Sequence, residues 1–253
     1  MKIVVCIKQV LVLSDELEFT DDGRDVDHDL LDPALNEWDT FSTEEALRLR
    51  EAAGDGEVVV VTVGPDDADD ALRRCLAMGA DRAIRVEPES ESILDPITVA
   101  RMLAEPVRDE GPDLVLTGVQ SSDSVQAATG TALAELLDLP RVAVVTNIDV
   151  VTGGTTATVH RELEGGLVDV VEVDLPAVLS IQTGINEPRY ANLRAIKQAK
   201  EKPLHVVSPG DTAVAASSVR RVFAPPKGDG ATMLDGSAAE VAAKLRDIIK
   251  ERV

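Results

Sequence analysis

The sequence predicts an α/β fold: a doubly wound, mostly parallel sheet with antiparallel hairpin additions and a C-terminal extension. Two observations predict it. In the first 140 residues, short apolar runs suited to buried strands alternate four times with helical segments. Such alternation requires crossover connections, which cover both faces of a parallel sheet with helices. After Pro140, β-like runs follow one another with glycine pairs between them, which is typical of hairpins.

The parallel part is expected to begin with a strand at 2–10, followed by a polar, Asp-rich loop or hairpin at 15–32. Residues 42–45 (Ser-Thr-Glu-Glu) have the pattern of a capping box, which predicts a helix that starts there and stops at Gly54. Further strands are expected at 57–63, 83–86 and 113–118, and further helices at 66–78, 96–110 and from about 123 to 137.

The second part is expected to hold strands at 142–150, 156–162 and 168–173, arranged as antiparallel hairpins rather than further crossovers, and another strand at 176–182. Residues 186–202, called here the basic segment, carry five of the scarce cations and the only Tyr. In so acidic a chain, this patch favours an anionic partner over a merely solvated helix. After a loop at 224–230, an amphipathic helix from Ser237 to about Lys250 predicts packing on another subunit.

The composition is strongly acidic, with 25 Lys and Arg against 46 Asp and Glu and a net charge of −21. A polyanion repels phosphate backbones and anionic lipid, so nucleic acid and direct membrane insertion are not expected. The sequence has neither a long apolar run nor a signal-peptide layout, and a cytoplasmic location is expected. The acidity is interpreted as adaptation to a salty cytoplasm, as in halophilic archaea; the alternative is an acidic docking surface.

Common catalytic and metal-binding motifs are absent from the sequence. Cys6 and Cys75 both lie in apolar runs and are expected to be buried, reduced thiols. The three histidines have no metal-ligand spacing, so no metal site is expected. The hydrolase elbow, the phosphate-binding P-loop and the G-x-G-x-x-G dinucleotide fingerprint do not occur either.

A candidate site follows from the predicted sheet, because doubly wound sheets bind ligands at the carboxyl ends of their strands where the strand order reverses. The segments that reach this edge are 6–9, 35–39, 63–64 and 118–129. In the last of these, Gly118 permits close approach, four hydroxyl side chains follow, and a helix begins that offers free amides to an anion. The alternative is an ordinary strand-to-helix turn capped by Asp123 or Ser124.

A series of short motifs extends over some two hundred residues. They are Cys-Ile-Lys-Gln-Val at 6–10, Glu-Glu-Ala-Leu-Arg-Leu at 44–49, Val-Gly-Pro at 63–65, Ala-Met-Gly-Ala-Asp-Arg-Ala at 77–83, Arg-Glu at 161–162 with Gly-Gly at 165–166, Leu-Pro-Ala-Val at 175–178, and Asn-Glu-Pro-Arg-Tyr-Ala-Asn-Leu at 186–193. In this order they make the chain resemble the beta subunits of the electron transfer flavoproteins.

The resemblance implies a Rossmann-like nucleotide-binding domain at 1–206, with a recognition loop near 186–202, and a linker and helix at 207–253 that pack on an alpha subunit. It implies an electron carrier rather than an enzyme. By the same resemblance, FAD is expected to be shared with the alpha subunit, and AMP or a second FAD is expected to lie in the beta subunit. The implied partners are acyl-CoA and related dehydrogenases as donors and a quinone oxidoreductase as acceptor.

By the same resemblance, specific residues receive roles. The cofactor-binding residues are Cys6, Asn36, Glu37, Trp38, Asp39, Val63, Gly118, Val119, Gln120, Ser121, Ser122, Asp123, Ser124, Val125, Gln126, Ala127, Ala128 and Thr129. Arg161 and Glu162 are expected to steady the mobile flavin domain of the partner. Arg189, Tyr190 and Leu193 are expected to contact partners, with Leu193 seated in an apolar pocket of the dehydrogenase; the alternative for Leu193 is ordinary helix packing.

Some positions depart from the family pattern. Asn36 is followed by Glu37 rather than Pro, Val119 stands where a cation is common, and Ala127 and Ala128 replace an amide pair. Three alternatives therefore stay open for the pocket: AMP held by backbone amides, a second FAD, or no nucleotide. Two other functions are also considered, a bifurcating subunit that oxidises NADH and a stand-alone adenine-nucleotide sensor.

Overall fold

The computed structural model describes residues 1–12, 17–28, 31–88, 95–151, 153–209, 217–226, 228 and 230–252. Parts of the predicted polar stretch (15, 16, 29 and 30) and of the predicted 224–230 loop (227 and 229) lie outside the described residues.

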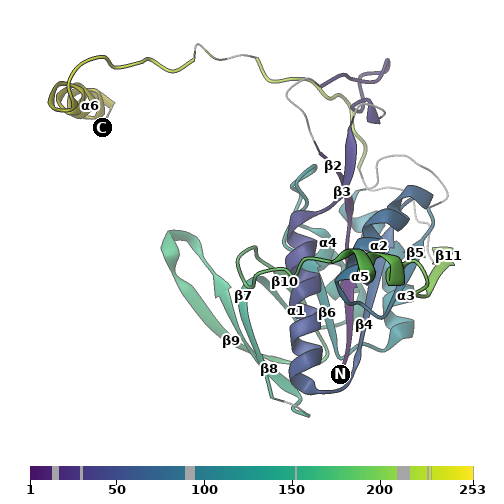
Figure 1. Ribbon diagram of the computed structural model, residues 1–253. Helices are drawn as coiled ribbons and strands as arrows, with labels where there is room; N and C mark the ends of the chain where they lie inside the picture. Colours follow the sequence, from purple (N-terminus) through teal and green to yellow (C-terminus); the bar gives the residue numbers. More distant parts are fainter. Residues whose placement is uncertain are drawn as a thin grey trace.

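Within the described chain, one nine-stranded sheet has the order β11-β5-β4-β1-β6-β10-β7-β8-β9 (Figure 1). Its strands are β1 (Lys2–Cys6), β4 (Glu57–Val63), β5 (Arg82–Val86), β6 (Leu114–Gly118), β7 (Arg141–Val150), β8 (Thr156–Glu162), β9 (Val168–Asp174), β10 (Ala177–Ile181) and β11 (Leu204–Val207). Pairing is parallel from β11 to β7 and antiparallel from β7 to β9. The predicted fold class is confirmed.

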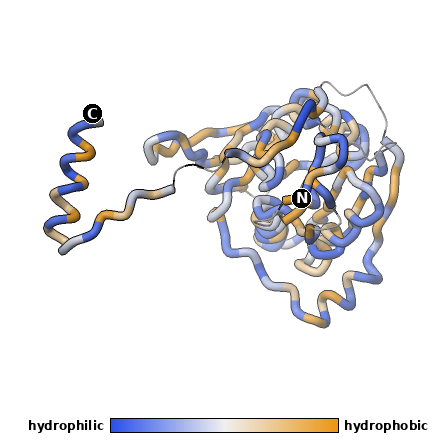
Figure 2. Tube along the Cα trace, turned by 90° about the horizontal axis from the view of Figure 1, so that it is seen from above, coloured by the Kyte–Doolittle hydropathy of each residue, from blue (hydrophilic) through white to orange (hydrophobic). Residues whose placement is uncertain are grey.

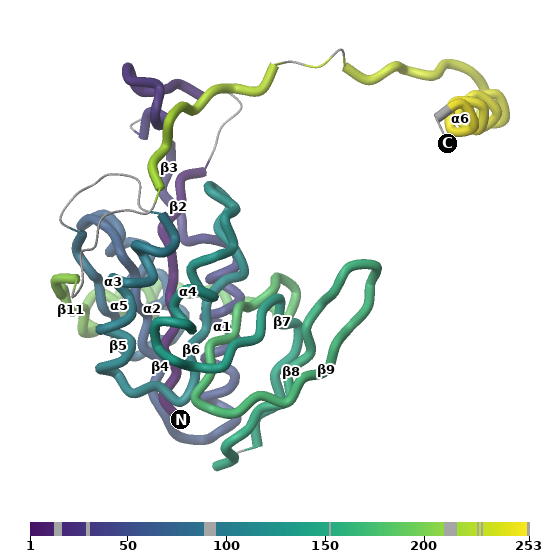
Figure 3. Tube along the Cα trace, turned by 180° about the vertical axis from the view of Figure 1, so that it is seen from behind, coloured from purple at the N-terminus to yellow at the C-terminus, as the bar shows by residue number. Residues whose placement is uncertain are grey.

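Helices cover both faces of the parallel part (Figures 1 and 3). On one face lie α1 (Glu37–Ala53), α2 (Asp69–Met78) and α5 (Leu193–Ala199); on the other lie α3 (Pro96–Glu110) and α4 (Thr129–Leu137). The alternation of β1 explains the two layers, because Ile3 and Val5 pack under α1 and α2 while Val4 and Cys6 face the core beneath α3 and α4.

The strand order reverses between β1 and β6. From β1 the chain builds outward through β4 and β5, whereas β6, β10 and β7 lie on the other side of β1. The carboxyl ends of β1 and β6 therefore form the topological switch point, which is the edge where doubly wound sheets leave room for a ligand. Residues 6–9 and 118–129 both begin at this edge.

The predicted start of the first helix was wrong, although its end at Gly54 is confirmed by a left-handed φ of 76°. Helix α1 begins at Glu37, and residues 42–45 lie inside it. Instead of capping, the Ser42 and Thr43 hydroxyls donate to the carbonyls of Trp38 and Asp39, four residues earlier. The start was missed because Asn36 ends an extended segment without a side-chain cap.

The predicted helix start near Asp123 was also wrong. Helix α4 begins at Thr129, and residues 119–128 form a long turn that includes left-handed φ angles at Val125 and Ala127. Asp123 and Ser124 cap no helix, because the Asp123 carboxylate accepts instead from Lys8, Ser121 and Ser124. The hydroxyl-rich sequence that suggested a cap folds into a loop with its own hydrogen bonds.

The four strands predicted in the second part are confirmed, and so is the pairing predicted for the first three, whereas no pairing was predicted for the fourth. Strands β7, β8 and β9 form the expected antiparallel hairpins. Strand β10 is a crossover strand, inserted between β6 and β7 and parallel to both. The short strand β11, which was not predicted, pairs with β5 at the far edge of the sheet. Both are short runs whose neighbours are distant in sequence, so local pattern could not assign their partners.

Outside the main sheet, β2 (Gln9–Val12) pairs antiparallel with β3 (Asp32–Leu35), and the 3₁₀ turns η2 (Asp66–Ala68) and η3 (Glu164–Gly166) lie in connecting segments. The terminal helix α6 (Ala238–Arg252) lies apart from the α/β body, with apolar and polar residues interspersed along it (Figures 1 and 2). Ser237 and Glu240 form its capping box. Exposed apolar side chains on α6 are Leu245, Ile248 and Ile249.

The aspartates of the 66–70 turn are accessible to solvent, with Asp66, Asp67 and Asp70 exposed. Crowded surface carboxylates repel one another unless salt screens them. We expect the midpoint of thermal unfolding to rise steadily from about 0.1 M to 2 M KCl, over which the Debye length falls from about 10 Å to below 3 Å. A thermal-melt series in KCl measures this, and a midpoint independent of salt would remove the interpretation of the acidity as salt adaptation.

Candidate functional site

Asp39, in the first turn of α1, ties together the two strand ends at the switch point. Its carboxylate accepts hydrogen bonds from the Lys8 amide at 2.7 Å, just after β1, and from the Gly118 amide at 3.0 Å, at the end of β6. A Cβ on Gly118 would collide with the Asp39 carboxylate and lie 2.7 Å from Cβ of Trp38. Gly118 is thus needed for close packing of α1 on β6, in addition to any approach by a ligand.

Burial dominates the electrostatics of this centre. It raises the pKa of Asp39 to about 7, against the opposing effect of the donated Lys8, Asn36 and Gly118 hydrogen bonds. It also raises the pKa of the Cys6 thiol to about 12, with the nearby Asp39 adding to the effect. Cys6 and Cys75 are both free and buried, as predicted. A protonated, buried thiol is a poor nucleophile, so Cys6 acts here as a small packing residue.

The 119–128 turn is fastened to the start of α1 and to Lys8. The Asn36 side chain donates to the Gln120 carbonyl at 2.9 Å and accepts from the Ser122 amide at 3.2 Å. The Lys8 ammonium lies 2.7 Å from the Asp123 carboxylate. Burial alone would raise the pKa of Asp123, but the hydrogen bonds from Lys8 and Ser121 hold it below its ordinary value. Lys8 therefore places a cation beside this loop.

Helix α4 begins at this loop without a side-chain cap. Its N-cap residue is Ala128, which makes no capping bond; α1 and α2 also lack a side-chain cap, whereas α3 and α5 are capped by Asp95 and Asn192. The first amides of an uncapped helix are free to bind an anion, which the helix dipole also favours. The left-handed φ of 51° at Val125 is rare for a β-branched residue, and such strain is concentrated at binding sites.

A polar chain leads from this centre to the hairpins. The indole of Trp38 donates to the side-chain carbonyl of Gln182 at 3.0 Å, and the Gln182 amide donates to the exposed Glu162 at 3.3 Å. Arg161, the neighbour of Glu162 on β8, has a buried Nε without a hydrogen-bond partner among the described residues. Sequence reasoning missed the linking role of Gln182, because nothing local marks the end of β10 as the neighbour of α1.

The basic segment is attached to α1 by its first residues. The Arg189 guanidinium lies 2.8 Å from the buried Glu44 and 2.6 Å from Glu51, and Asn186 donates to Glu45 at 2.9 Å. Burial raises the pKa of Glu45, and the hydrogen bond from Asn186 opposes this rise. Glu44 and Glu45 are thus buried acids that hold this segment, a role the capping-box interpretation concealed.

Beyond this attachment the segment presents large apolar side chains to solvent. Tyr190 is 94% exposed and Leu193 is 81% exposed, and Ile196 is also exposed. The alternative that Leu193 packs into the core is thus not what the fold shows. Of the five cations, Arg189 bonds to α1 and Lys202 donates to carbonyls of the α2 turn, while Arg194, Lys197 and Lys200 are exposed.

Other features lie away from this edge. A cavity of about 520 Å³ lies near the amino-terminal end of the sheet, lined by Met1, Leu49, Pro176 and neighbouring residues. In the part of the chain that the structure describes, no helix combines the length and apolarity needed to cross a bilayer. Over those same residues, no group of three His, Cys, Asp or Glu side chains is placed to hold a metal ion.

Comparison with known proteins gives a consistent result. A family model described as "Electron transfer flavoprotein domain" matches residues 27–212. The chain is 48% identical over 261 residues to the electron transfer flavoprotein subunit beta of Methylophilus methylotrophus, which covers 99% of this chain and 98% of the relative. It is 36% identical to the beta subunit of Syntrophomonas wolfei, covering 100% and 97%, and 34% identical to that of Homo sapiens, covering 98% of each.

Proposed function

The chain belongs to the electron transfer flavoprotein family, whose beta subunits it matches over nearly its full length, and from this premise we propose a specific carrier role. It pairs with an alpha subunit, and the pair carries electrons in the cytoplasm from acyl-CoA and related dehydrogenases to a quinone oxidoreductase. FAD at the subunit interface supplies the redox chemistry, while the protein supplies position and field. The observation that carries the proposal is the match across the whole chain, which includes the hairpins and the C-terminal segment.

An adenine nucleotide is proposed to bind at the switch point. Support comes from the uncapped α4 N-terminus, the hydroxyls of Ser121 and Ser124, and the Lys8 ammonium beside them. These groups suit the phosphate of AMP, or the AMP moiety of a second FAD. Asn36, Asp39 and Gly118 keep the loop and strand ends in register. The nucleotide is thus proposed as a structural ligand of this chain.

Contacts with the alpha subunit are proposed at two places. The exposed Glu162 at the end of β8 accepts a hydrogen bond from Gln182, and it is available to steady the flavin-bearing domain. The apolar side chains of α6 need a partner surface to cover them, because an amphipathic helix gains its stability from packing. A stand-alone nucleotide sensor would need neither feature, and the full-length match to beta subunits disfavours that alternative.

Leu193 is proposed to dock into an apolar pocket of the donor dehydrogenase. Replacing Leu193 with alanine is expected to slow reduction of the bound flavin by a substrate-reduced acyl-CoA dehydrogenase by about tenfold to thirtyfold, the usual effect of losing a small apolar anchor worth about 2 kcal/mol. Stopped-flow absorbance of the flavin measures the rate. Reduction by dithionite and flavin content should not change, and unchanged kinetics with the dehydrogenase would contradict the docking role.

The whole proposal is tested by co-expression with the alpha subunit encoded in the same cells. We expect a yellow pair in molar KCl that releases FAD and AMP on denaturation, identified by mass spectrometry. Two FAD per pair, together with NADH oxidation, would instead indicate a bifurcating subunit. A colourless protein that never binds the alpha subunit would overturn the carrier role.

A further inference from the structure

The helix that presents Leu193 is too short to be stable without contacts to the rest of the protein. Helix α5 has seven residues, Leu193–Ala199, whereas isolated helices shorter than about 12–15 residues are marginal in water. Its position therefore depends on its contacts with the rest of the protein. One set lies before it, where Arg189 and Asn186 bond to α1. A second set lies behind it, where α5 packs beside α2.

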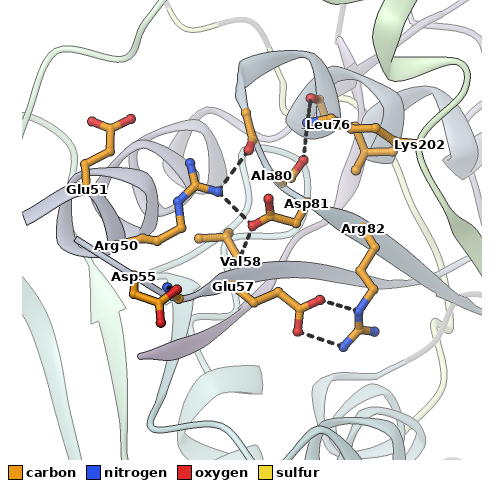
Figure 4. Close-up of polar contacts among 12 residues, drawn as sticks. Arg50, Glu51, Asp55, Glu57, Val58, Leu76, Ala80, Asp81, Arg82 and Lys202 are labelled. Carbon is orange, nitrogen blue, oxygen red and sulfur yellow. Dashed lines mark hydrogen bonds and ion pairs between the residues drawn. The ribbon is translucent and has the colours of Figure 1, made fainter. Parts of the chain in front are cut away.

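At the C-terminal end of α5, two cationic side chains form reciprocal hydrogen bonds: each donates to backbone carbonyls at or just after the end of the opposite helix. Arg73, on α2, donates from one guanidinium nitrogen to the carbonyls of Ala199 and Lys202, both at 2.8 Å. Lys202 donates in return to the carbonyls of Leu76 and Ala80, at 3.0 and 2.5 Å, where α2 ends (Figure 4). Each cation thus satisfies carbonyls that a helix end or following turn leaves without an intrahelical donor.

The orientation of α5 determines which of its side chains are exposed to a partner. Ala199 is buried, whereas Leu193 and Ile196 are exposed. This is the reverse of an ordinary surface helix, which turns its large apolar residues to the core. A helix with only small residues on its buried side gains little from hydrophobic packing. The polar exchange with α2 is therefore a principal restraint on its rotation and on fraying of its last turn.

We propose that Arg73 and Lys202 are positioning residues that fix α5 against α2 and so hold Leu193 and Ile196 in the geometry for partner docking. This inference rests on the proposed function for the choice of partner, but its structural half does not. Lys202 fits the role, because burial lowers the pKa of its ammonium against the opposing effect of Asp81, as expected of a cation set into the fold. Neither residue needs to touch the partner.

The structural half is tested by hydrogen–deuterium exchange on the assembled flavin-containing pair. Arg73→Gln is compared with Arg74→Gln, which changes an exposed arginine on the same helix. We expect amide exchange in residues 195–200 to become at least about fivefold faster in Arg73→Gln only, in keeping with loss of charge-assisted bonds to carbonyls. Lys202→Met should act like Arg73→Gln, and Lys202→Arg should restore most of the protection. Equal exchange in Arg73→Gln and Arg74→Gln would overturn the proposal.

The functional half is tested by a double-mutant cycle with Leu193→Ala, using a substrate-reduced acyl-CoA dehydrogenase as probe. We expect Arg73→Gln to lower kcat/KM for flavin reduction by about fivefold, mainly through KM, while dithionite reduction stays unchanged. In the Leu193→Ala background the same change should have a clearly smaller effect, because much of it acts through Leu193 and only the contribution of Ile196 is left. Fully additive effects would overturn the positioning role.

The two failures are distinguishable. If Leu193→Ala leaves the kinetics unchanged, the docking role in the proposed function fails, and the exchange measurement still decides whether Arg73 and Lys202 fix α5. If Leu193→Ala slows reduction but Arg73→Gln does not, docking stands and the positioning role of Arg73 fails.

Discussion

Replacing Arg189 with leucine is expected to lower the free energy of unfolding of the assembled pair by about 2–3 kcal/mol. Breaking a fully buried ion pair typically costs about 3–5 kcal/mol. The loss expected here is smaller, because the Arg189 guanidinium is partly exposed to water. The large effect is expected because Glu44 is buried and its carboxylate accepts three hydrogen bonds from Arg189. The donors are the backbone amide, Nε and Nη2 of Arg189. Removing the guanidinium leaves a buried carboxylate with one amide donor.

The measurement is chemical denaturation of wild type and variant at equal protein concentration, near neutral pH. Arg189 also holds the pKa of Glu51 below its ordinary value of 4.5. A carboxylate with a lowered pKa contributes stability above its unfolded pKa and loses it as the pH falls, so the difference between the proteins should shrink below about pH 4.5.

Two variants serve as controls for this prediction. Arg194→Leu removes an exposed arginine from the same segment and should change stability by less than about 0.5 kcal/mol. Adding Glu44→Gln to Arg189→Leu should recover part of the loss, because the buried charge is then gone. An Arg189→Leu protein as stable as Arg194→Leu would show that the α1 attachment contributes nothing.

Much of the fold of this molecule could be predicted from its sequence. Strand and helix types in the parallel part could be predicted because burial on both faces produces continuous apolar runs, as in β4. The switch-point edge followed from the alternation alone, since crossover topology fixes where strand ends gather. The family resemblance then supplied the partner and cofactor roles, which no periodicity carries.

What could not be predicted depends on contacts between distant residues. Glu44 and Glu45 have the pattern of a helix start, yet they are buried in α1 because residues more than 140 positions away bond to them. Sequence analysis assigned no role to Arg73 and counted Lys202 only among the cations of the basic segment. Their roles depend on carbonyls at helix ends, and a carbonyl carries no mark in the sequence. Sequence alone therefore located the basic segment but not its attachments.

The stability contributed by Asp39 is expected to fall as the pH rises from about 4 to about 7. Burial raises the pKa of Asp39 from 3.8 to about 7 in the folded protein. Between these values the folded state holds a proton that the unfolded state releases, so folding becomes less favourable as the pH rises. A shift of about three units corresponds to about 4 kcal/mol, all of it lost by about pH 7 and constant above.

The comparison with Asp39→Asn isolates this titration, because asparagine keeps the shape and does not ionise. Glu45, whose pKa burial also raises, titrates in both proteins and cancels in the difference. We expect wild type to lose about 4 kcal/mol relative to Asp39→Asn between pH 4 and pH 7.5, measured by chemical denaturation of the assembled pair. The opposite trend would mean that the Lys8 and Gly118 amides outweigh burial, so that Asp39 holds the switch point as a carboxylate throughout.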